Sequence, residues 1–189
     1  MPKISRDFLE TRLAAKNLDL QSFVIEKLDL SGMSFDGVDL SGGSMGRCEL
    51  SNSTFRSARL IETDFGYSTL QTSDFTKATA SYAHFEKCNL TGAVIRACDF
   101  KGTNFMNSDL TGADLENSNL ENANLTGVNA TNASFFRCVL KTTDLSESNL
   151  LGSNFREATF DEKTLRSISN SKNWRSSQFD VAIFEKLSS

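Results

Sequence analysis

Apolar residues recur at every fifth position along most of this chain, and this period restricts the folds that the chain can adopt. From Leu20 to Leu165, all thirty positions spaced five apart are apolar, and only Ala80 and Ala130 are small. On an α-helix, five residues advance about 140° beyond a full turn, so the apolar side chains would spiral around the helix instead of forming one stripe. On a flat strand, an odd step would send successive apolar residues to opposite faces. The chain must therefore bend once in every repeat.

The residues around each apolar centre indicate where the bend lies. Two positions before the centre the residue is mostly Ser, Ala, Thr or Cys, and the residue between them is often Asp or Asn. Residues two apart in extended backbone point the same way, so the small residue and the centre both point inward and the residue between them points outward. The two remaining positions are rich in Gly, Ser, Thr and Asn, which suit a tight turn. Each repeat is predicted to be three extended residues followed by a corner.

The distribution of phenylalanine predicts four sides per coil. When the centres are sorted by twenty residues, one column contains no phenylalanine: Leu30, Leu50, Leu70, Leu90, Leu110, Ala130 and Leu150. The next column contains five: Phe35, Phe55, Phe75, Ile95, Leu115, Phe135 and Phe155. A three-sided coil would mix these columns. Four sides predict about seven and a half coils. At a strand spacing of about 4.8 Å they form a rod roughly 35 Å long.

The repeat Ala-(Asp/Asn)-Leu-x-x resembles the pentapeptide-repeat family. It stands at residues 113–117 (Ala-Asp-Leu-Glu-Asn), at 123–127 (Ala-Asn-Leu-Thr-Gly) and, more loosely, at 108–112 (Ser-Asp-Leu-Thr-Gly). The resemblance covers about 148 of the 189 residues. It implies an all-β solenoid, a right-handed quadrilateral β-helix, and its handedness comes from the resemblance alone. In layout the chain is most similar to the loop-free, fluoroquinolone-resistance members that mimic DNA.

The chain divides into a repeat region and two ends that are expected to form short helical caps. Residues 1–17 are predicted to form a capping helix with Ser5 as its N-cap and with Ile4, Phe8 and Leu9 on one face. Such a helix would cover the open edge of the first coil, and a partner-binding helix is the alternative. Residues 18–165 are predicted to form the β-helix, and residues 166–189, which leave the five-residue phase, are predicted to form the C-terminal cap.

The C-terminal segment carries more apolar residues than a small cap needs. Its large apolar side chains are at helical spacing after a tryptophan: Trp174, Phe179, Ile183, Phe184 and Leu187. They are the candidate interface of a homodimer, because relatives in the family often dimerise through this end. Plain capping explains them equally well.

The four cysteines are expected to be reduced core residues. All of them, Cys48, Cys88, Cys98 and Cys138, fall at the small inward position. The pairs that share a side are two coils apart, roughly 10 Å, which is too far for a disulfide. The charged residues at the start of the sequence are not followed by the apolar run of a signal peptide. No stretch approaches the roughly 20 apolar residues of a membrane span. We therefore expect a cytoplasmic protein that does not enter a membrane.

The net charge of −4 is unevenly distributed. Residues 18–165 contain 20 acidic and 12 basic side chains, whereas the two ends contain 4 acidic and 8 basic ones. No basic residue lies between Lys101 and Arg137, a stretch in which four acidic residues are expected to point outward: Asp109, Asp114, Glu116 and Glu121. They form the candidate partner-binding band. A negative shaft disfavours nucleic acid and favours a basic protein surface, although a solvated surface that only maintains solubility is the alternative.

No pattern typical of catalysis appears. The single histidine, His84, is at an outward position, and the sequence contains no phosphate-binding loop, no metal-spaced cluster and no nucleophile–base arrangement. We expect a protein that is not an enzyme and holds no cofactor or metal. The family resemblance implies a DNA mimic that binds DNA gyrase or topoisomerase IV and confers resistance to quinolones or to a gyrase toxin. The alternative is a general protein–protein interaction scaffold, a regulatory or effector module with no topoisomerase role.

Overall fold

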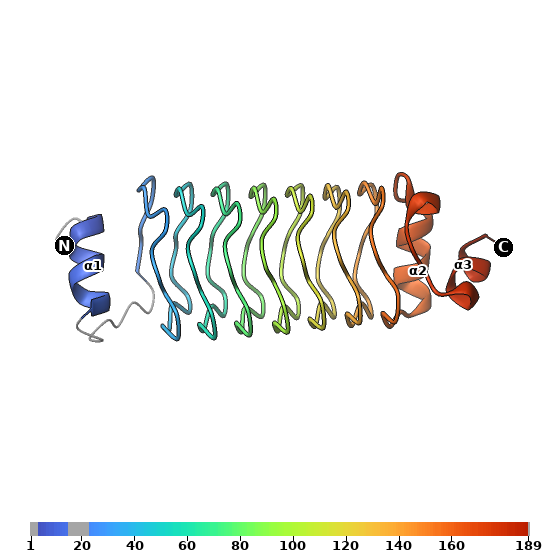
Figure 1. Ribbon diagram of the computed structural model, residues 1–189, viewed down its shortest axis with the longest axis horizontal. Coiled ribbons are helices and arrows are strands. Elements are labelled where there is room, and N and C mark those ends of the chain that lie inside the picture. Colours follow the sequence, from blue (N-terminus) through green and yellow to red (C-terminus); the bar gives the residue numbers. More distant parts are fainter. Residues whose placement is uncertain (1–3, 15–22, 189) are drawn as a thin grey trace.

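The computed structural model describes residues 4–14 and 23–188, and these form a rod of stacked coils with helices at both ends (Figure 1). Helix α1 (Arg6–Ala14) lies at the N-terminal end. Helix α2 (Glu162–Ser169), the 3-10 helix η1 (Trp174–Ser176) and helix α3 (Val181–Ser188) lie at the C-terminal end. The shaft between them consists of turns and very short extended segments.

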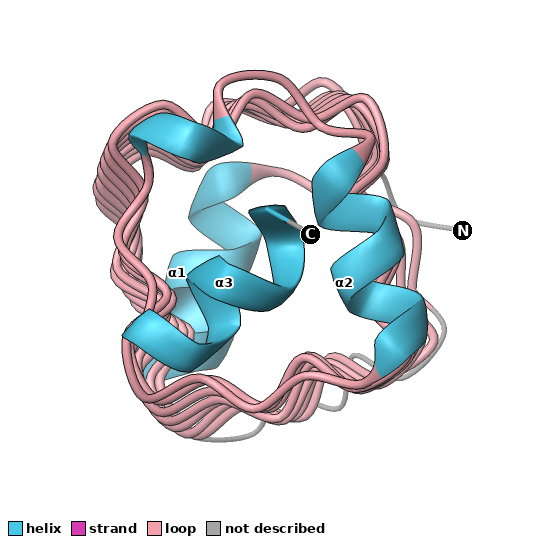
Figure 2. Cartoon of the chain, turned by 90° about the vertical axis from the view of Figure 1, so that its right-hand side faces the viewer, coloured by secondary structure: helices cyan, strands magenta, loops and turns pink. Residues whose placement is uncertain are grey.

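Every coil of the shaft contains twenty residues. Parallel β-bridges join residues twenty positions apart, from the pair Val24 and Ser44 to the pair Val139 and Thr159. One residue of each five-residue repeat makes the bridge, so each coil has four sides, and the view along the rod shows a square outline (Figure 2). This is the four-sided solenoid that the phenylalanine columns predict. Residues 23–160 make about seven coils.

The corners explain the preferred residue types of the repeat. The second corner residue has positive φ throughout, for example Gly112 at 64° and Tyr67 at 62°. Glycine adopts this conformation without strain, and asparagine tolerates it better than most residues. The outward Asp or Asn before each centre stabilises the corner: Asp109 Oδ1 accepts a hydrogen bond from the backbone N–H of Thr111 at 2.9 Å. The Asp/Asn preference is thus partly structural.

The core is a continuous column of apolar centres. Phe75 is fully buried, and its ring stacks on that of Phe55, one coil away, with centroids 4.8 Å apart. The small inward residues complete the packing and satisfy the backbone. Ser118 Oγ, for example, donates to the carbonyl oxygen of Ile95 at 2.6 Å. The inward hydroxyl of Ser118 is thus hydrogen-bonded, as buried polar groups usually are.

The cysteines occupy the same inward position. All four are free thiols and buried. Burial raises the pKa of Cys88, Cys98 and Cys138 to about 12, because the thiolate would lose its hydration there. Burial also raises the pKa of Cys48.

These shifted thiols predict a loss of stability at high pH. Their folded-state pKa lies above the unfolded value of about 8.5, so their contribution is complete below that pH and is lost as the pH rises towards 12. The free energy of unfolding should fall by up to about 1.4 kcal/mol per pH unit for each thiol. Urea denaturation at successive pH values should show a flatter profile for a variant with Cys88, Cys98 and Cys138 all changed to Ala. An equal slope in both proteins would contradict the assignment.

Helix α1 is joined to its own N-terminus and to the first described coil by hydrogen bonds. Ser5 Oγ accepts a hydrogen bond from Phe8 N at 3.3 Å, and Leu9 is fully buried. The Arg6 guanidinium donates to the carbonyl oxygen of Ser31 at 3.1 Å, on the first described coil. The predicted limit of the cap at residue 17 and the centre Leu20 cannot be compared with α1, because residues 15–22 lie outside the described part of the chain.

The C-terminal cap begins earlier than the five-residue phase predicts. The predicted repeat limit at residue 165 is wrong, because Asp161 is the N-cap of α2 and Leu165 lies within this helix. Its hydroxyls replace the hydrogen bonds of a further coil: Thr164 Oγ1 donates to the carbonyl oxygen of Leu140 at 2.5 Å, and Ser167 Oγ accepts from Leu145 N at 3.1 Å. The helix satisfies the edge of the last coil without offering a new edge.

After α2 the chain returns to the path of the coils. Lys172 and Gln178 form bridges with Asn149 and Asn154, and the ring of Phe179 stacks on that of Phe155 with centroids 5.0 Å apart.

None of the helices in residues 4–14 and 23–188 has the length and the apolar composition of a membrane span.

Candidate functional site

The four acidic residues of the predicted band lie on three sides of the rod. Asp109 bridges to Asn89 and Asn129, whereas Asp114 bridges to residues 94 and 134 on the next side. Glu116 shares the side of Asp114, and Glu121 lies on the side that follows. We call these four residues the acidic belt, because they are spread over three sides of the shaft instead of forming one patch.

Basic residues of the preceding coil pair with most of the belt. Arg96 contacts the carboxylates of Asp114 at 2.5 Å and Glu116 at 3.8 Å, and Lys101 contacts that of Glu121 at 3.3 Å. The lack of basic residues between 101 and 137 therefore does not leave an unpaired negative band. This pairing could have been predicted from the twenty-residue register, because Arg96 and Lys101 precede Glu116 and Glu121 by twenty positions.

Two belt residues also support the backbone. Asp109 Oδ1 accepts from Thr111 N at 2.9 Å, and Asp114 Oδ1 accepts from Glu116 N at 3.1 Å. The Glu116 and Glu121 side chains accept no backbone hydrogen bond in the described residues. Replacing Asp109 or Asp114 by Lys would therefore remove a corner contact as well as a charge, whereas Asn would keep the contact.

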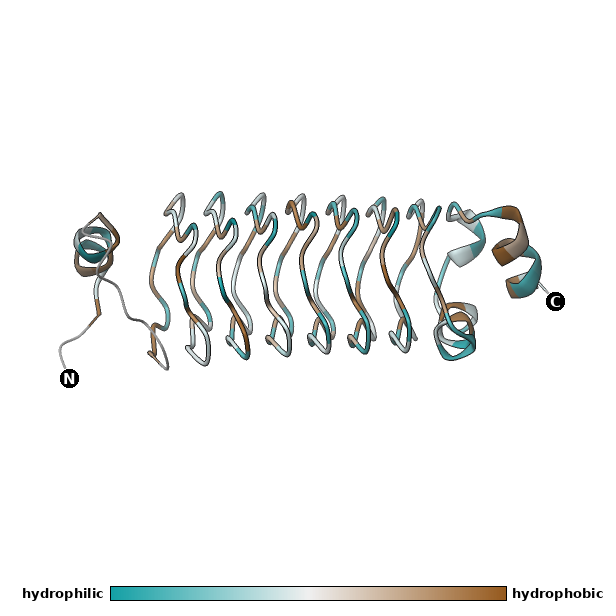
Figure 3. Ribbon diagram, turned by 90° about the horizontal axis from the view of Figure 1, so that it is seen from below, coloured by the Kyte–Doolittle hydropathy of each residue, from teal (hydrophilic) through white to brown (hydrophobic). Residues whose placement is uncertain are grey.

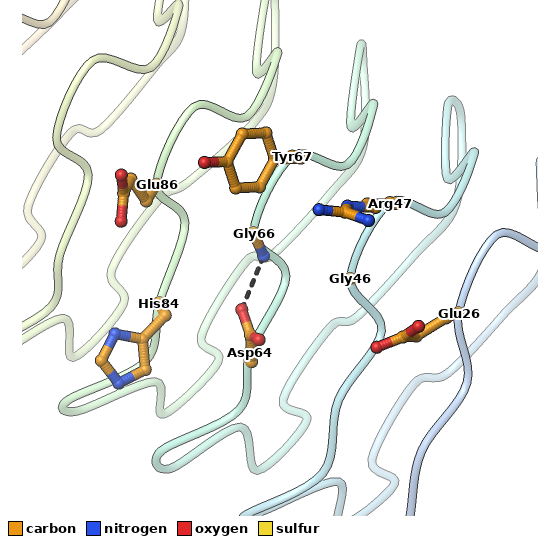
Figure 4. Close-up of a pocket in the computed structure, with 8 residues that line it drawn as sticks. All are labelled: Glu26, Gly46, Arg47, Asp64, Gly66, Tyr67, His84 and Glu86. Atoms are coloured by element: carbon orange, nitrogen blue, oxygen red, sulfur yellow. Dashed lines mark hydrogen bonds between the residues drawn. The ribbon is translucent and has the colours of Figure 1, made fainter.

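A shallow depression of about 500 Å³, which we call the notch, lies on the fourth side of the rod (Figure 4). It is lined by Glu26, Gly46, Arg47, Asp64, Gly66, Tyr67, His84 and Glu86. Glu26, Gly46, Gly66 and Glu86 are twenty residues apart and form one row along the shaft. The two glycines lie in the middle of this row, so the notch is a gap in a line of side chains.

A cation–aromatic cluster forms one margin of the notch. Tyr67 is 53% exposed and stands on the corner between Arg47 and Lys87. The Arg47 guanidinium lies 5.6 Å and the Lys87 ammonium 5.1 Å from the centre of its ring. Lys87 Nζ also donates to Tyr67 Oη at 3.1 Å and contacts the Glu86 carboxylate at 3.6 Å. The sequence analysis noted His84 as an outward residue and did not find that it shares a depression with Tyr67.

Two of the predicted dimer-interface residues pack against the core of their own chain. Trp174 is 4% exposed and lies 5.9 Å from Phe184 between ring centres, and Phe179 extends the column of stacked rings through Phe155. Ile183 and Leu187 are half-buried.

The exposed apolar surface at this end is therefore smaller than the sequence predicts. Phe184 is 40% exposed, and Val181, which sequence reasoning missed, is 76% exposed on the same helix. Helix α3 contains no buried residue, and its apolar residues are visible in the hydropathy view (Figure 3).

Within residues 4–14 and 23–188, no group of three or more His, Cys, Asp or Glu side chains is placed to hold a metal ion. The one histidine is exposed, and the notch that it lines contains no serine or cysteine. Features suited to contact another molecule in this part of the chain include the belt, the notch and the exposed residues of α3.

Comparisons with known proteins identify the repeat. A family model described as "Pentapeptide repeat region" matches residues 28–105 and 78–155. No curated protein matches the sequence.

Solved structures with likeness to this chain include three named here. HetL, a pentapeptide repeat protein involved in heterocyst differentiation regulation from the cyanobacterium Nostoc sp. strain PCC 7120, is 18% identical, with 93% of this chain and 94% of HetL covered and a TM-score of 0.39. QnrB1, a plasmid-mediated fluoroquinolone resistance protein, is 16% identical, with 98% and 92% covered and a TM-score of 0.44. Rfr23 from the cyanobacterium Cyanothece 51142 is 18% identical, with 87% and 98% covered and a TM-score of 0.31.

The family match spans well over half of the chain, and the twenty-residue register of the coils agrees with it. Both confirm the resemblance that the repeated Ala-(Asp/Asn)-Leu motif indicates. The chain belongs to the pentapeptide-repeat family.

Proposed function

We propose that this rod is a non-enzymatic binding protein whose shaft contacts a basic surface of a protein partner. The observation that carries the proposal is the charge of the outward side chains. Residues 23–160 contain 17 acidic and 11 basic residues, and each of them is at an outward position of its repeat. A net negative shaft repels nucleic acid and attracts a basic protein surface.

DNA gyrase or topoisomerase IV is the specific partner that we propose. These enzymes bind DNA through basic surfaces, and a negatively charged rod can occupy such a surface as a DNA mimic. The support is the resemblance to DNA-mimicking members of the family together with the negative shaft. The expected consequence is resistance to quinolones or to a gyrase toxin.

Charge reversal in the acidic belt should weaken an effect on supercoiling by purified gyrase. The variant with Glu116→Lys and Glu121→Lys changes the net charge from −4 to 0 and leaves every backbone hydrogen bond of the corners in place. Its effect on gyrase should fall sharply, and the effect of the unchanged protein should weaken with salt, since exposed charges are screened within about 8–10 Å. A second variant, Asp109→Asn with Asp114→Asn, removes charge and keeps the corner contacts.

The matched control changes the same charge elsewhere on the shaft. The variant with Glu62→Lys and Glu147→Lys also has a net charge of 0. Both residues occupy the second corner position with positive φ, a conformation that lysine adopts elsewhere in the shaft, at Lys27 and Lys77. Retained activity in this control with lost activity in the belt variant supports the belt. Equal loss in both means that the partner responds to net charge. If the unchanged protein leaves supercoiling and quinolone sensitivity unaltered, the topoisomerase proposal is rejected.

The alternative proposal is a protein–protein interaction scaffold with no topoisomerase role. The ion pairs of Arg96 and Lys101 favour it, because they reduce the charge that a DNA mimic would present. Under either proposal we place the protein in the cytoplasm and propose a homodimer through α3, with Val181 and Phe184 as its exposed apolar contacts.

A further inference from the structure

The fold does not require the two glycines of the notch. Most glycines of the shaft occupy the second corner position at positive φ, but Gly46 and Gly66 occupy the first corner position and have no positive φ. A Cβ atom on Gly46 would approach no atom closer than 3.5 Å. On Gly66 it would lie 3.0 Å from Asp64 Oδ1, the end of a side chain.

Equivalent positions of the same row carry side chains, including Met106, Thr126 and Ser146. Glycine at two neighbouring positions of this row therefore changes the shape of the surface and not the path of the backbone. It opens a gap about two coils tall, roughly 10 Å, between Glu26 and Glu86.

The charges around this gap suit a cation. Asp64 Oδ1 accepts from Gly66 N at 2.8 Å, while its Oδ2 faces the open position above Gly46, 4.0 Å from where a Cβ would stand. Within the described ranges, no basic side chain lies within 4.0 Å of the Glu26 or Asp64 carboxylates, whereas Glu86 is paired with Lys87. Figure 4 shows the carboxylates of Glu26 and Asp64 around the two glycines. Two carboxylates with free lone pairs thus face one open space.

We propose that the notch binds an arginine side chain of the partner protein. A guanidinium is planar and presents five N–H donors, so it can contact two carboxylates at once. Tyr67, whose ring already lies between Arg47 and Lys87, forms only the margin of this space. The inference deepens the proposed function and rests on it, because it assumes a protein partner with a basic surface.

The arginine site can be tested on the full-length protein with N-acetyl-L-arginine amide as the probe. In ¹H–¹⁵N spectra at low salt, the amide signals of Gly46 and Gly66 should shift saturably, while that of Gly112, which lies in a different row, should not. The variant Gly46→Gln with Gly66→Gln fills the gap and should lose the saturable shift of neighbouring amides. Thr126→Gln, the same substitution type in the same row, should keep it. Asp64→Asn retains the acceptor for Gly66 N and should weaken binding about threefold to fivefold, as for an exposed ion pair.

Several results would overturn the site. The site is rejected if the unchanged protein shows no saturable shift, or if Gly112 shifts as much as the two glycines of the notch. It is also rejected if the Gly46→Gln, Gly66→Gln variant keeps its melting temperature and binds the probe undiminished. Equal affinity for N-acetyl-L-lysine amide would overturn the assignment to a guanidinium. Because this titration contains no topoisomerase, its failure removes the arginine site and leaves the gyrase proposal to the supercoiling assay.

Discussion

Replacing Phe75 by Asp is expected to unfold the central coils of the rod. Phe75 is fully buried, stacks on Phe55 and makes an edge contact with Phe85 at 5.7 Å between ring centres. Loss of a buried phenylalanine side chain costs about 3–5 kcal/mol, and an unpaired carboxylate in its place costs several more. Because the whole stability of a typical domain is about 5–15 kcal/mol, the variant should show little cooperative melting by circular dichroism.

The control is Gln71→Asp, which introduces the same charge in the same coil at an exposed corner. Surface changes of this kind usually stay within about 0.5 kcal/mol, so its melting temperature should be close to that of the unchanged protein. Similar melting temperatures for Phe75→Asp and Gln71→Asp would contradict the inward assignment of the apolar centres.

Removal of the whole C-terminal cap is expected to convert the protein into aggregates. A chain that ends at Phe160 loses the hydroxyls of Thr164 and Ser167, which satisfy the last coil, and loses Phe179, which covers Phe155. Its final coil would present unpaired backbone groups and an exposed apolar column, and such edges pair with other chains. Sedimentation velocity should show large species in place of one discrete boundary.

A chain that ends at Asp180 provides the matched control. It keeps α2, Trp174 and Phe179, and it retains the Asp180 carboxylate that accepts from Glu157 N at 3.0 Å. Because α3 contains no buried residue, this chain should remain folded and free of aggregates, and under the dimer proposal it should be a monomer. A discrete boundary for the chain ending at Phe160 would show that the last coil needs no cap.

The interior of the shaft could be predicted from the sequence because each repeat specifies its own bend. The centre, the small residue before it and the corner residues act within five positions, so the phase alone assigned Phe75 and Leu110 to the core. The period of twenty in the phenylalanines added the number of sides. Even the N-cap at Ser5 follows from local residue types.

Contacts between coils and the ends of the rod depended on the tertiary structure. Leu165 keeps the five-residue phase, yet it lies in a helix, because Asp161 caps α2 and the hydroxyls of this helix satisfy an edge that no further coil covers. Phe179 begins a series at helical spacing and Trp174 precedes it, yet Phe179 stacks on Phe155 of the last coil and Trp174 is buried within its own chain.

The surface follows the same division. The acidic residues of the belt are evident in the sequence, but the pairing of Asp114, Glu116 and Glu121 with Arg96 and Lys101 depends on the stacking of the preceding coil. The notch arises in the same way, since two glycines twenty residues apart form a gap only when their coils are stacked. Local sequence determines the backbone of a solenoid because each bend is local, whereas its surface depends on which side chains the stacking brings side by side.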